Sequence, residues 1–242
     1  MLTKKDIHHV FQPVICSQTK KTIGYEALLR HARTSNPVAL FQTAREQGWH
    51  SKLDMLSIEK VIETFRFHHV ETLFINIFPT TLLTQDFPTF LEKVISENSF
   101  NSNQIVFELN ETAEEKHVWG NPNLKDIVSL IRKKGFHIAI DDVGVGAASL
   151  KQVIEYNPDI IKLDRYFSNQ LAVSDDKQAV LAFFVDYCRK KNKKLVLEGI
   201  ENLEDFESAK SLDVPYLQGY YIGKPSRYVQ NGHNREYATL YI

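Results

Sequence analysis

Short apolar runs alternate with longer stretches of helical pattern along this chain. The runs are rich in branched and aromatic residues and are bounded by polar or turn-forming residues, which is typical of β-strands. Apolar residues recur at helical spacing in segments 55–65, 124–131 and 180–188. An alternation of strand and helix that reaches eight strands predicts an α/β fold, the (β/α)8 TIM-like barrel. The eight predicted strands are 11–15, 23–29, 73–77, 105–109, 137–141, 160–164, 195–198 and 216–220.

The connection between the first two predicted strands departs from this alternation. Only residues 16–22 separate them, whereas a crossover between parallel strands needs about a dozen residues or more. These two strands should therefore pair antiparallel, and we expect a barrel with an antiparallel first strand. No linker-like segment divides the chain, so residues 1–242 are expected to form a single domain.

Alternation along each predicted strand separates core positions from candidate site positions. Side chains alternate between the two faces of a strand, and the outer face of a barrel is apolar because helices cover it. In the run 137–141, Ile138 and Ile140 therefore point outward and Asp141 points inward. Polar groups near the carboxyl ends of several strands indicate a site, because barrel enzymes keep their chemistry at that face. The same rule places these further side chains inward: Glu26, Arg30, Asn76, Glu108, Lys162, Asp164, Glu198 and Gln218.

Asp141 is followed directly by Asp142 and a glycine-containing turn. In one interpretation, one aspartate caps the next helix and the other is solvated. In the other, the two carboxylates bind a divalent cation that compensates their repulsion. The other inward acids favour the second interpretation and supply enough charge for two ions. Hard cations such as Mg2+ or Mn2+ prefer the oxygen ligands that this cluster offers, namely Glu26, Asn76, Glu108, Asp141 and Asp142.

Lys162 is the inward cation among these acids. Without metal ions it is interpreted as a salt-bridge partner of Asp141 or Glu198. With metal ions bound, it would position an attacking water or offset charge on phosphoryl oxygens. The residues themselves leave both roles open.

The composition limits the classes of partner. The formal net charge of -1 gives no general electrostatic reason to bind DNA, RNA or an anionic membrane. A phosphate-bearing ligand would have to be held locally. Cys16 and Cys188 form neither a C-x-x-C pair nor a disulfide framework, and no apolar run suits a signal peptide or membrane span. We therefore expect a cytoplasmic protein without membrane insertion.

A series of short motifs covers about residues 10–226 in one order, from Gln12-Pro13 and Gly24 to Pro225. They read Glu26-Ala-Leu-Leu-Arg30, Asn76, Glu108-Leu-Asn-Glu111, Asp141-Asp142-x-Gly-x-Gly, Lys162-Leu-Asp164, Glu198-Gly-Ile-Glu201 and Gln218-Gly-Tyr. This series resembles the EAL domain family of bacterial hydrolases, which act on the second messenger c-di-GMP. The resemblance implies a cyclic-guanylate-specific phosphodiesterase that opens c-di-GMP to linear 5'-pGpG with water activated by two Mg2+ or Mn2+ ions.

The resemblance also implies individual roles and a homodimer. It assigns metal binding to the five oxygen ligands already named. The remaining assignments are catalysis for Lys162, Glu198 and Gln218, substrate binding for Arg30, Asp54 and Asp164, and loop anchoring for Glu111 and Glu201. Family members commonly dimerise, so a homodimer is expected.

Four features depart from the usual family pattern. Phe78 stands where serine is usual, Asn110 where threonine is usual and Arg45 where glutamate is usual. The segment 143–148 lacks the usual aromatic and hydroxyl side chains. None of these departures removes an implied metal ligand. The alternative is a catalytically weak or inactive EAL domain that binds c-di-GMP or another protein, and the retained ligands favour the enzyme.

Overall fold

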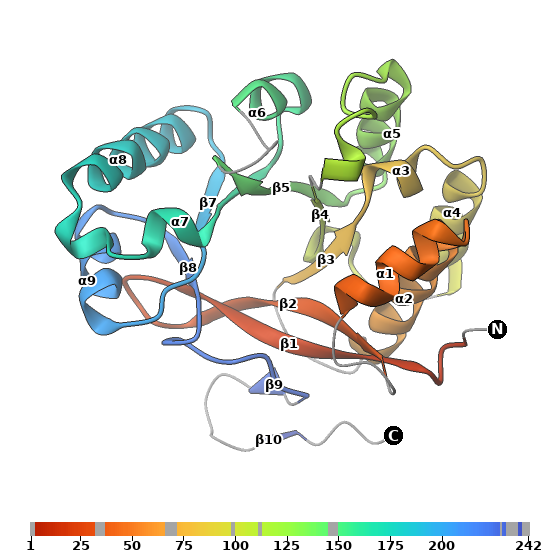
Figure 1. The fold of residues 1–242 in the computed structure, drawn as a ribbon, viewed down its shortest axis with the longest axis horizontal. Coiled ribbons are helices and arrows are strands. Elements are labelled where there is room, and N and C mark those ends of the chain that lie inside the picture. The colour runs from red at the N-terminus through yellow and green to blue at the C-terminus, as the bar shows by residue number, and fades with distance from the viewer. Residues whose placement is uncertain are drawn as a thin grey trace.

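Eight strands close into a barrel in the order in which they occur along the chain (Figure 1). The computed structural model describes residues 3–31, 37–65, 72–97, 100–110, 113–144, 150–227, 229–230 and 237–238. The barrel strands are β1 (Ile7–Cys16), β2 (Thr22–His31), β3 (Leu73–Ile77), β4 (Ile105–Leu109), β5 (His137–Val143), β6 (Ile160–Leu163), β7 (Lys194–Leu197) and β8 (Tyr216–Gln218). A separate two-stranded sheet contains β9 (Val229–Gln230) and β10 (Tyr237–Ala238). The predicted (β/α)8 TIM-like barrel is confirmed.

The first strand runs against both of its neighbours. β1 pairs antiparallel with β2 and with β8, whereas the neighbouring pairs from β2 to β8 are parallel. This confirms the antiparallel first strand. Each strand of the β1–β2 hairpin is ten residues long, which is longer than the sequence pattern predicted. Backbone pairing extends the hairpin to Ile7 opposite His31, because ladder hydrogen bonds do not depend on whether a side chain is apolar.

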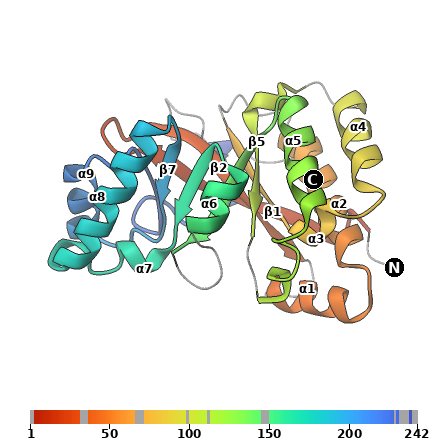
Figure 2. The ribbon, with the colours of Figure 1, turned by 90° about the horizontal axis from the view of Figure 1, so that it is seen from above.

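Helices pack along the outside of the parallel strands, and Figure 2 shows them from above. The three predicted helical segments fall within α2, α5 and α8. The helix α5 ends in Arg132 and Lys133, and Gly135 follows at a φ of 90°, so a cationic last turn and a glycine end this helix. The helices are α1 (Pro37–Glu46), α2 (His50–Phe65), α3 (Pro79–Leu82), α4 (Phe87–Glu97), α5 (Pro122–Lys133), α6 (Leu150–Tyr156), α7 (Arg165–Ser168), α8 (Asp175–Lys190) and α9 (Leu203–Ser211).

Within the described residues, the connections also contain three short 3-10 turns, η1 (Ser102–Gln104), η2 (Ala113–Glu115) and η3 (Leu171–Val173). Among the residues that the structure describes, no helix has both the length and the apolar character needed to cross a bilayer.

Two apolar layers hold the strands in place. The outer layer lies between strands and helices and includes Ile138 and Ile140, both fully buried. The inner layer fills the barrel interior, and its buried members are Val14, Phe74, Val106, Ala139, Ile160 and Val196. Alternation along the strands thus separates the two layers as predicted. Further along the same inward rows, apolar side chains give way to polar ones near the carboxyl ends of the parallel strands.

Gly219 lies where β8 leaves the barrel and passes close to the chain after β7. The N–H group of Ile200 donates to the carbonyl oxygen of Gln218 at 3.0 Å. A Cβ atom on Gly219 would lie 2.1 Å from the carbonyl oxygen of Ile200, a contact that backbone atoms cannot relieve by changing rotamer.

We therefore expect Gly219→Ala to lower the free energy of unfolding by about 1–3 kcal/mol, as other overpacking substitutions do. Urea denaturation measures this. Gly120→Ala is the matched control, because a Cβ atom at Gly120 meets nothing within 4 Å, and its effect should stay within about 0.5 kcal/mol. Equal midpoints for the two variants would contradict the close approach at Gly219.

Candidate active site

Lys162 lies buried at the polar end of the barrel, surrounded by four carboxylates. Its Nζ atom lies 2.5 Å from Glu198 Oε1, 2.7 Å from Glu108 Oε1, 3.1 Å from Asp141 Oδ1 and 3.5 Å from Glu26 Oε2. The four acids come from β2, β4, β5 and the residue after β7, and the lysine comes from β6. The ion pairs predicted for Lys162 in the absence of metal are therefore present with both Asp141 and Glu198. The parallel strands bring these five side chains to one point.

The charges in this cluster do not balance. Burial and the neighbouring carboxylates raise the pKa of Glu108 and of Glu198 well above the usual range, although Lys162 opposes the shift. Burial alone would lower the pKa of Lys162, but the surrounding acids hold that pKa well above its usual value. One ammonium group thus faces more negative charge than it can neutralise, so an additional cation would stabilise the ionised acids.

The oxygen atoms of Glu108 fit such a cation. Glu108 is fully buried; its Oε1 atom is paired with Lys162, and within the described residues its Oε2 atom has no hydrogen-bond partner. Ligand atoms of Asp141, Asp142 and Glu198 all lie within 4.8 Å of one another. Mg2+, Mn2+ and Ca2+ prefer oxygen ligands. A buried carboxylate oxygen without a hydrogen-bond partner, next to further carboxylates, is a ligand of this kind. The residues therefore fit a hard divalent cation.

A β-bulge brings Asp142 to the same cluster as Asp141. Consecutive residues of a regular strand point to opposite faces, which would separate the two acids. The pairing of β5 with β6 shifts register between Ile140 and Val143, and Asp142 has a φ of 53°. The irregular backbone turns both carboxylates toward the end of the barrel. Asp141 is buried and Asp142 is exposed.

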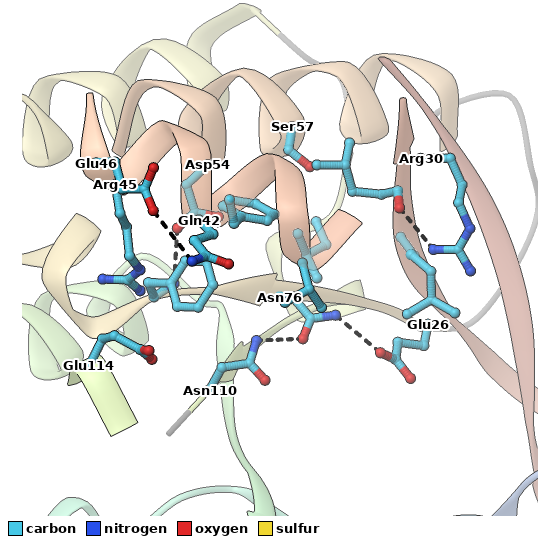
Figure 3. A pocket seen from close by; sticks show the side chains of 17 residues that line it. Glu26, Arg30, Gln42, Arg45, Glu46, Asp54, Ser57, Asn76, Asn110 and Glu114 are labelled. Carbon is cyan, nitrogen blue, oxygen red and sulfur yellow. Dashed lines mark hydrogen bonds between the residues drawn. The ribbon is translucent and has the colours of Figure 1, made fainter. Parts of the chain in front are cut away.

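Side-chain amides hold Glu26 from both sides. Gln218 Nε2 donates to Glu26 Oε2 at 2.6 Å, and Asn76 Nδ2 donates to Glu26 Oε1 at 3.0 Å. Asn110 Nδ2 donates in turn to Asn76 Oδ1 at 2.6 Å, and Figure 3 shows this chain of amides. Burial opposes ionisation of Glu26, but Lys162 and the two amides lower its pKa. Glu26 is therefore held as an oriented carboxylate.

Sequence reasoning missed two residues of this network. Asn110 has the same parity as Glu108, so alternation continued past the end of the strand would have identified it. Gln12 lies opposite Glu26 in the β1–β2 hairpin, and Gln218 Nε2 lies 3.4 Å from Gln12 Oε1. The register of the hairpin was the available signal for Gln12.

Two hollows adjoin the cluster, and Glu26 lines both. The larger one, of about 550 Å³, is also lined by Arg30, Asp54 and Asn76 (Figure 3). The smaller one, of about 270 Å³, is lined by five more of the predicted residues, Asp142, Asp164, Glu198, Glu201 and Gln218. The predicted substrate-binding residues are thus divided between two spaces that meet at Glu26.

The remaining predicted residues have local contacts. Asp164 Oδ1 accepts from the N–H group of Tyr166 at 2.7 Å and caps α7. Glu201 is exposed, with Oε1 at 3.5 Å from Arg165 Nη2. Arg30 Nη1 donates to the carbonyl oxygen of Leu29 at 2.8 Å. Glu111 and most of the divergent segment 143–148 lie outside the described residues.

Comparison with known proteins gives consistent results. A family model described as EAL domain matches residues 1–225. The chain is 28% identical over 211 residues to the cyclic di-GMP phosphodiesterase PdeF of Escherichia coli K12, covering 84% of this chain and 28% of that protein. Another E. coli relative, a probable cyclic di-GMP phosphodiesterase named PdeB, is covered over 43% of its length. The chain therefore spans less than half of these curated relatives.

Solved structures share the fold. A standalone EAL protein from Vibrio cholerae O395, in a c-di-GMP bound form, has a TM-score of 0.79 and 26% identity, covering 91% of this chain and 92% of that chain. The BlrP1 protein of Klebsiella pneumoniae, in a manganese/cy-diGMP complex, has a TM-score of 0.82 and 25% identity, covering 91% of this chain and 56% of that chain.

Asp54, which lines the larger hollow, has a pKa that is raised by burial, and this shift should change how stability depends on pH. Burial raises the pKa of Asp54 from 3.8 to about 7, although the N–H group of Phe78 donates to Asp54 Oδ2 at 2.9 Å. Between these two pH values the folded state keeps a proton that the unfolded state releases, so this group lowers stability as pH rises through that range. Below it both states are protonated, and above it the folded state carries the full cost of the buried charge.

Asp54→Asn keeps an acceptor oxygen but does not ionise. Its stability relative to wild type should therefore increase from pH 4 to pH 8, by on the order of 3 kcal/mol. Urea denaturation across this range measures the difference. Asp126→Asn, on an exposed position of α5, is the matched control, and its difference from wild type should not grow. A constant difference for Asp54→Asn would contradict the raised pKa.

Proposed function

Because this chain belongs to the EAL domain family, we propose that it is a metal-dependent cyclic di-GMP phosphodiesterase that hydrolyses c-di-GMP to linear 5'-pGpG. The observation that carries the proposal is the cluster of four carboxylates around Lys162, three of them buried and the fourth, Glu198, half-buried. Its uncompensated negative charge suits divalent cations, and it adjoins two hollows that suit a dinucleotide. The relatives named as c-di-GMP phosphodiesterases support the choice of substrate.

The proposed ligands of two divalent cations are Glu26, Asn76, Glu108, Asp141 and Asp142. All five offer oxygen atoms, which favours Mg2+ or Mn2+ over zinc. Asp141, between the buried acids and the exposed Asp142, is the proposed shared ligand. When bound, the ions supply Lewis-acid polarisation of the phosphate and lower the pKa of water. The manganese complex of the Klebsiella relative supports this class of ion.

The chain's own residues orient the reactants. The reaction adds a water oxygen to phosphorus and breaks the bond from phosphorus to the 3' oxygen, so a proton must leave the water and one must reach the 3' oxygen. Glu198, at the edge of the cluster, is the proposed acceptor of the water proton. Lys162 offsets negative charge that develops on the phosphoryl oxygens. Gln218 holds the carboxylate of Glu26 in place through its 2.6 Å hydrogen bond.

The two hollows support a cyclic dinucleotide as substrate. A phosphodiester held at Glu26, where the hollows meet, leaves one nucleotide for each side. Arg30 lines the larger hollow and is the proposed contact for a phosphate. Asp54 and Asp164, in the larger and the smaller hollow, are the proposed contacts for polar groups of the two nucleotides. Glu111 and Glu201 are proposed to anchor the loop after β5.

The proposal extends to a bacterial, cytoplasmic homodimer. Both Cys16 and Cys188 are free thiols, which agrees with a reducing compartment. The relatives compared above come from bacteria. The resemblance to a family whose members commonly dimerise supports the homodimer.

Incubation of the purified protein with c-di-GMP and Mg2+ or Mn2+ tests the proposed activity, with pGpG measured by chromatography. Wild type should produce pGpG, and EDTA should stop the reaction. Glu26→Gln, which removes a charged metal ligand, should lower kcat/KM by roughly a hundredfold or more. Glu207→Gln, an exposed acid of α9 outside both hollows, is the matched control and should retain wild-type turnover.

The same experiment separates the alternative functions. Tight binding of c-di-GMP without pGpG would identify a binding module instead of an enzyme. Absence of both binding and turnover would leave a protein-interaction role. An unchanged rate for Glu26→Gln would contradict the assignment of the metal site.

A further inference from the structure

The outer wall of the larger hollow combines two aromatic rings with one arginine. Phe41 and Arg45 come from α1, and Phe78 follows β3. The Cζ atom of Arg45 lies 4.7 Å from the centroid of the Phe78 ring, so the guanidinium group lies over that ring. Phe41 contacts Phe78 edge-on, with centroids 5.0 Å apart and ring planes at 73°. All three side chains line the hollow, and Figure 3 labels Arg45 there.

A buried carboxylate fixes the position of Arg45. Glu115, fully buried in η2, forms an ion pair with Arg45 Nη2. Its Oε2 atom also accepts from the N–H group of Thr80 at 2.7 Å, and its Oε1 atom accepts from Thr80 Oγ1 at 2.9 Å. A paired and hydrogen-bonded buried charge is costly to break. The guanidinium group is therefore held over the Phe78 ring before any ligand binds.

This wall lies in the same hollow as proposed ligands of the metal ions. Glu26 and Asn76 line one part of the hollow, and Arg45 and Phe78 line another. A ligand whose phosphodiester lies at Glu26 would thus extend its nucleoside into a space bordered by the wall. The hollow is also lined by the apolar side chains of Leu28 and Val38. Such a lining suits the faces of a planar base better than it suits a sugar or a phosphate.

We propose that Arg45 and Phe78 form a stacking platform for one base of the cyclic dinucleotide, with the guanidinium of Arg45 between the Phe78 ring and the base. Arginine stacks on planar groups through the faces of its guanidinium, and the Cζ atom of Arg45 already lies 4.7 Å from the Phe78 ring centroid. The proposal rests on the proposed function for the identity of the ligand. Phe78 and Arg45 are two of the positions where this chain departs from the usual family pattern, so the platform lies outside that pattern.

Two conservative variants test the platform. Arg45→Lys keeps a cation near Glu115 but removes the planar group, and Phe78→Leu keeps an apolar side chain but removes the ring. Loss of one stacking contact typically weakens binding about tenfold. Each variant should raise the KM for c-di-GMP about tenfold and leave kcat within about twofold, since neither residue lies among the proposed catalytic groups. Isothermal titration with c-di-GMP in EDTA should show a similar increase in Kd.

Controls distinguish recognition from general damage. Phe183→Leu, an aromatic side chain of α8 that is 50% exposed, should leave KM and Kd unchanged. Both platform variants should bind Mn2+ as wild type does, and thermal melting of each variant without ligand checks that it is folded.

The outcomes separate this proposal from the proposed function. Unchanged KM and Kd in both platform variants, with normal turnover by wild type, would overturn the platform and leave the phosphodiesterase assignment intact. A fall in kcat without a change in KM or Kd would also overturn it, because it would indicate an effect on the catalytic groups. If wild type binds c-di-GMP without cleaving it, KM cannot be measured. The Kd values of the platform variants then decide whether the platform exists. If wild type binds no c-di-GMP either in EDTA or with Mn2+ present, both proposals fail together.

Discussion

The central constraint in this structure is the burial of one ammonium group among four carboxylates. Burying charged groups costs free energy unless partners and hydrogen bonds compensate them. Lys162 compensates part of the negative charge at distances of 2.5 to 3.5 Å, and amides from Asn76 and Gln218 compensate part of that on Glu26. The remaining excess of negative charge is tolerated because the two apolar layers stabilise the closed barrel around the carboxylates. A site that retains uncompensated buried acid is suited to divalent cations.

The reversed first strand has a consequence for this site. The parallel strands direct their carboxyl ends toward the cluster, whereas β1 runs the other way and cannot contribute its own carboxyl end. It contributes Gln12 from within the strand instead, opposite Glu26 in the hairpin and near Gln218 of β8. The antiparallel pairing thus places β1 between Glu26 and Gln218. The hairpin supports the orientation of Glu26 without adding another charge.

Much of this arrangement was predictable from alternation along the strands. Glu26, Asn76, Glu108, Asp141 and Lys162 meet because each occupies an inward position on a strand whose pattern is clear. Asp142 was a candidate from its place beside Asp141, but regular alternation would have pointed it away, and only the bulge explains its position. The wall formed by Arg45, Phe78 and Glu115 could not be predicted, because these residues come from three elements that are distant in sequence.

The sequence by itself determined the barrel, its antiparallel first strand, the family and the set of polar side chains that face inward. These properties follow from short-range patterns, namely the two-residue period of strands, the length of one connection and the order of local motifs. The tertiary structure decided which of these side chains touch, how far Lys162 lies from each acid, and that Glu26 borders two separate hollows. Those distances depend on strand register, on a bulge and on helix packing. Register, bulge and helix packing are each set by contacts between segments that are far apart in the chain. A local sequence pattern cannot predict such contacts.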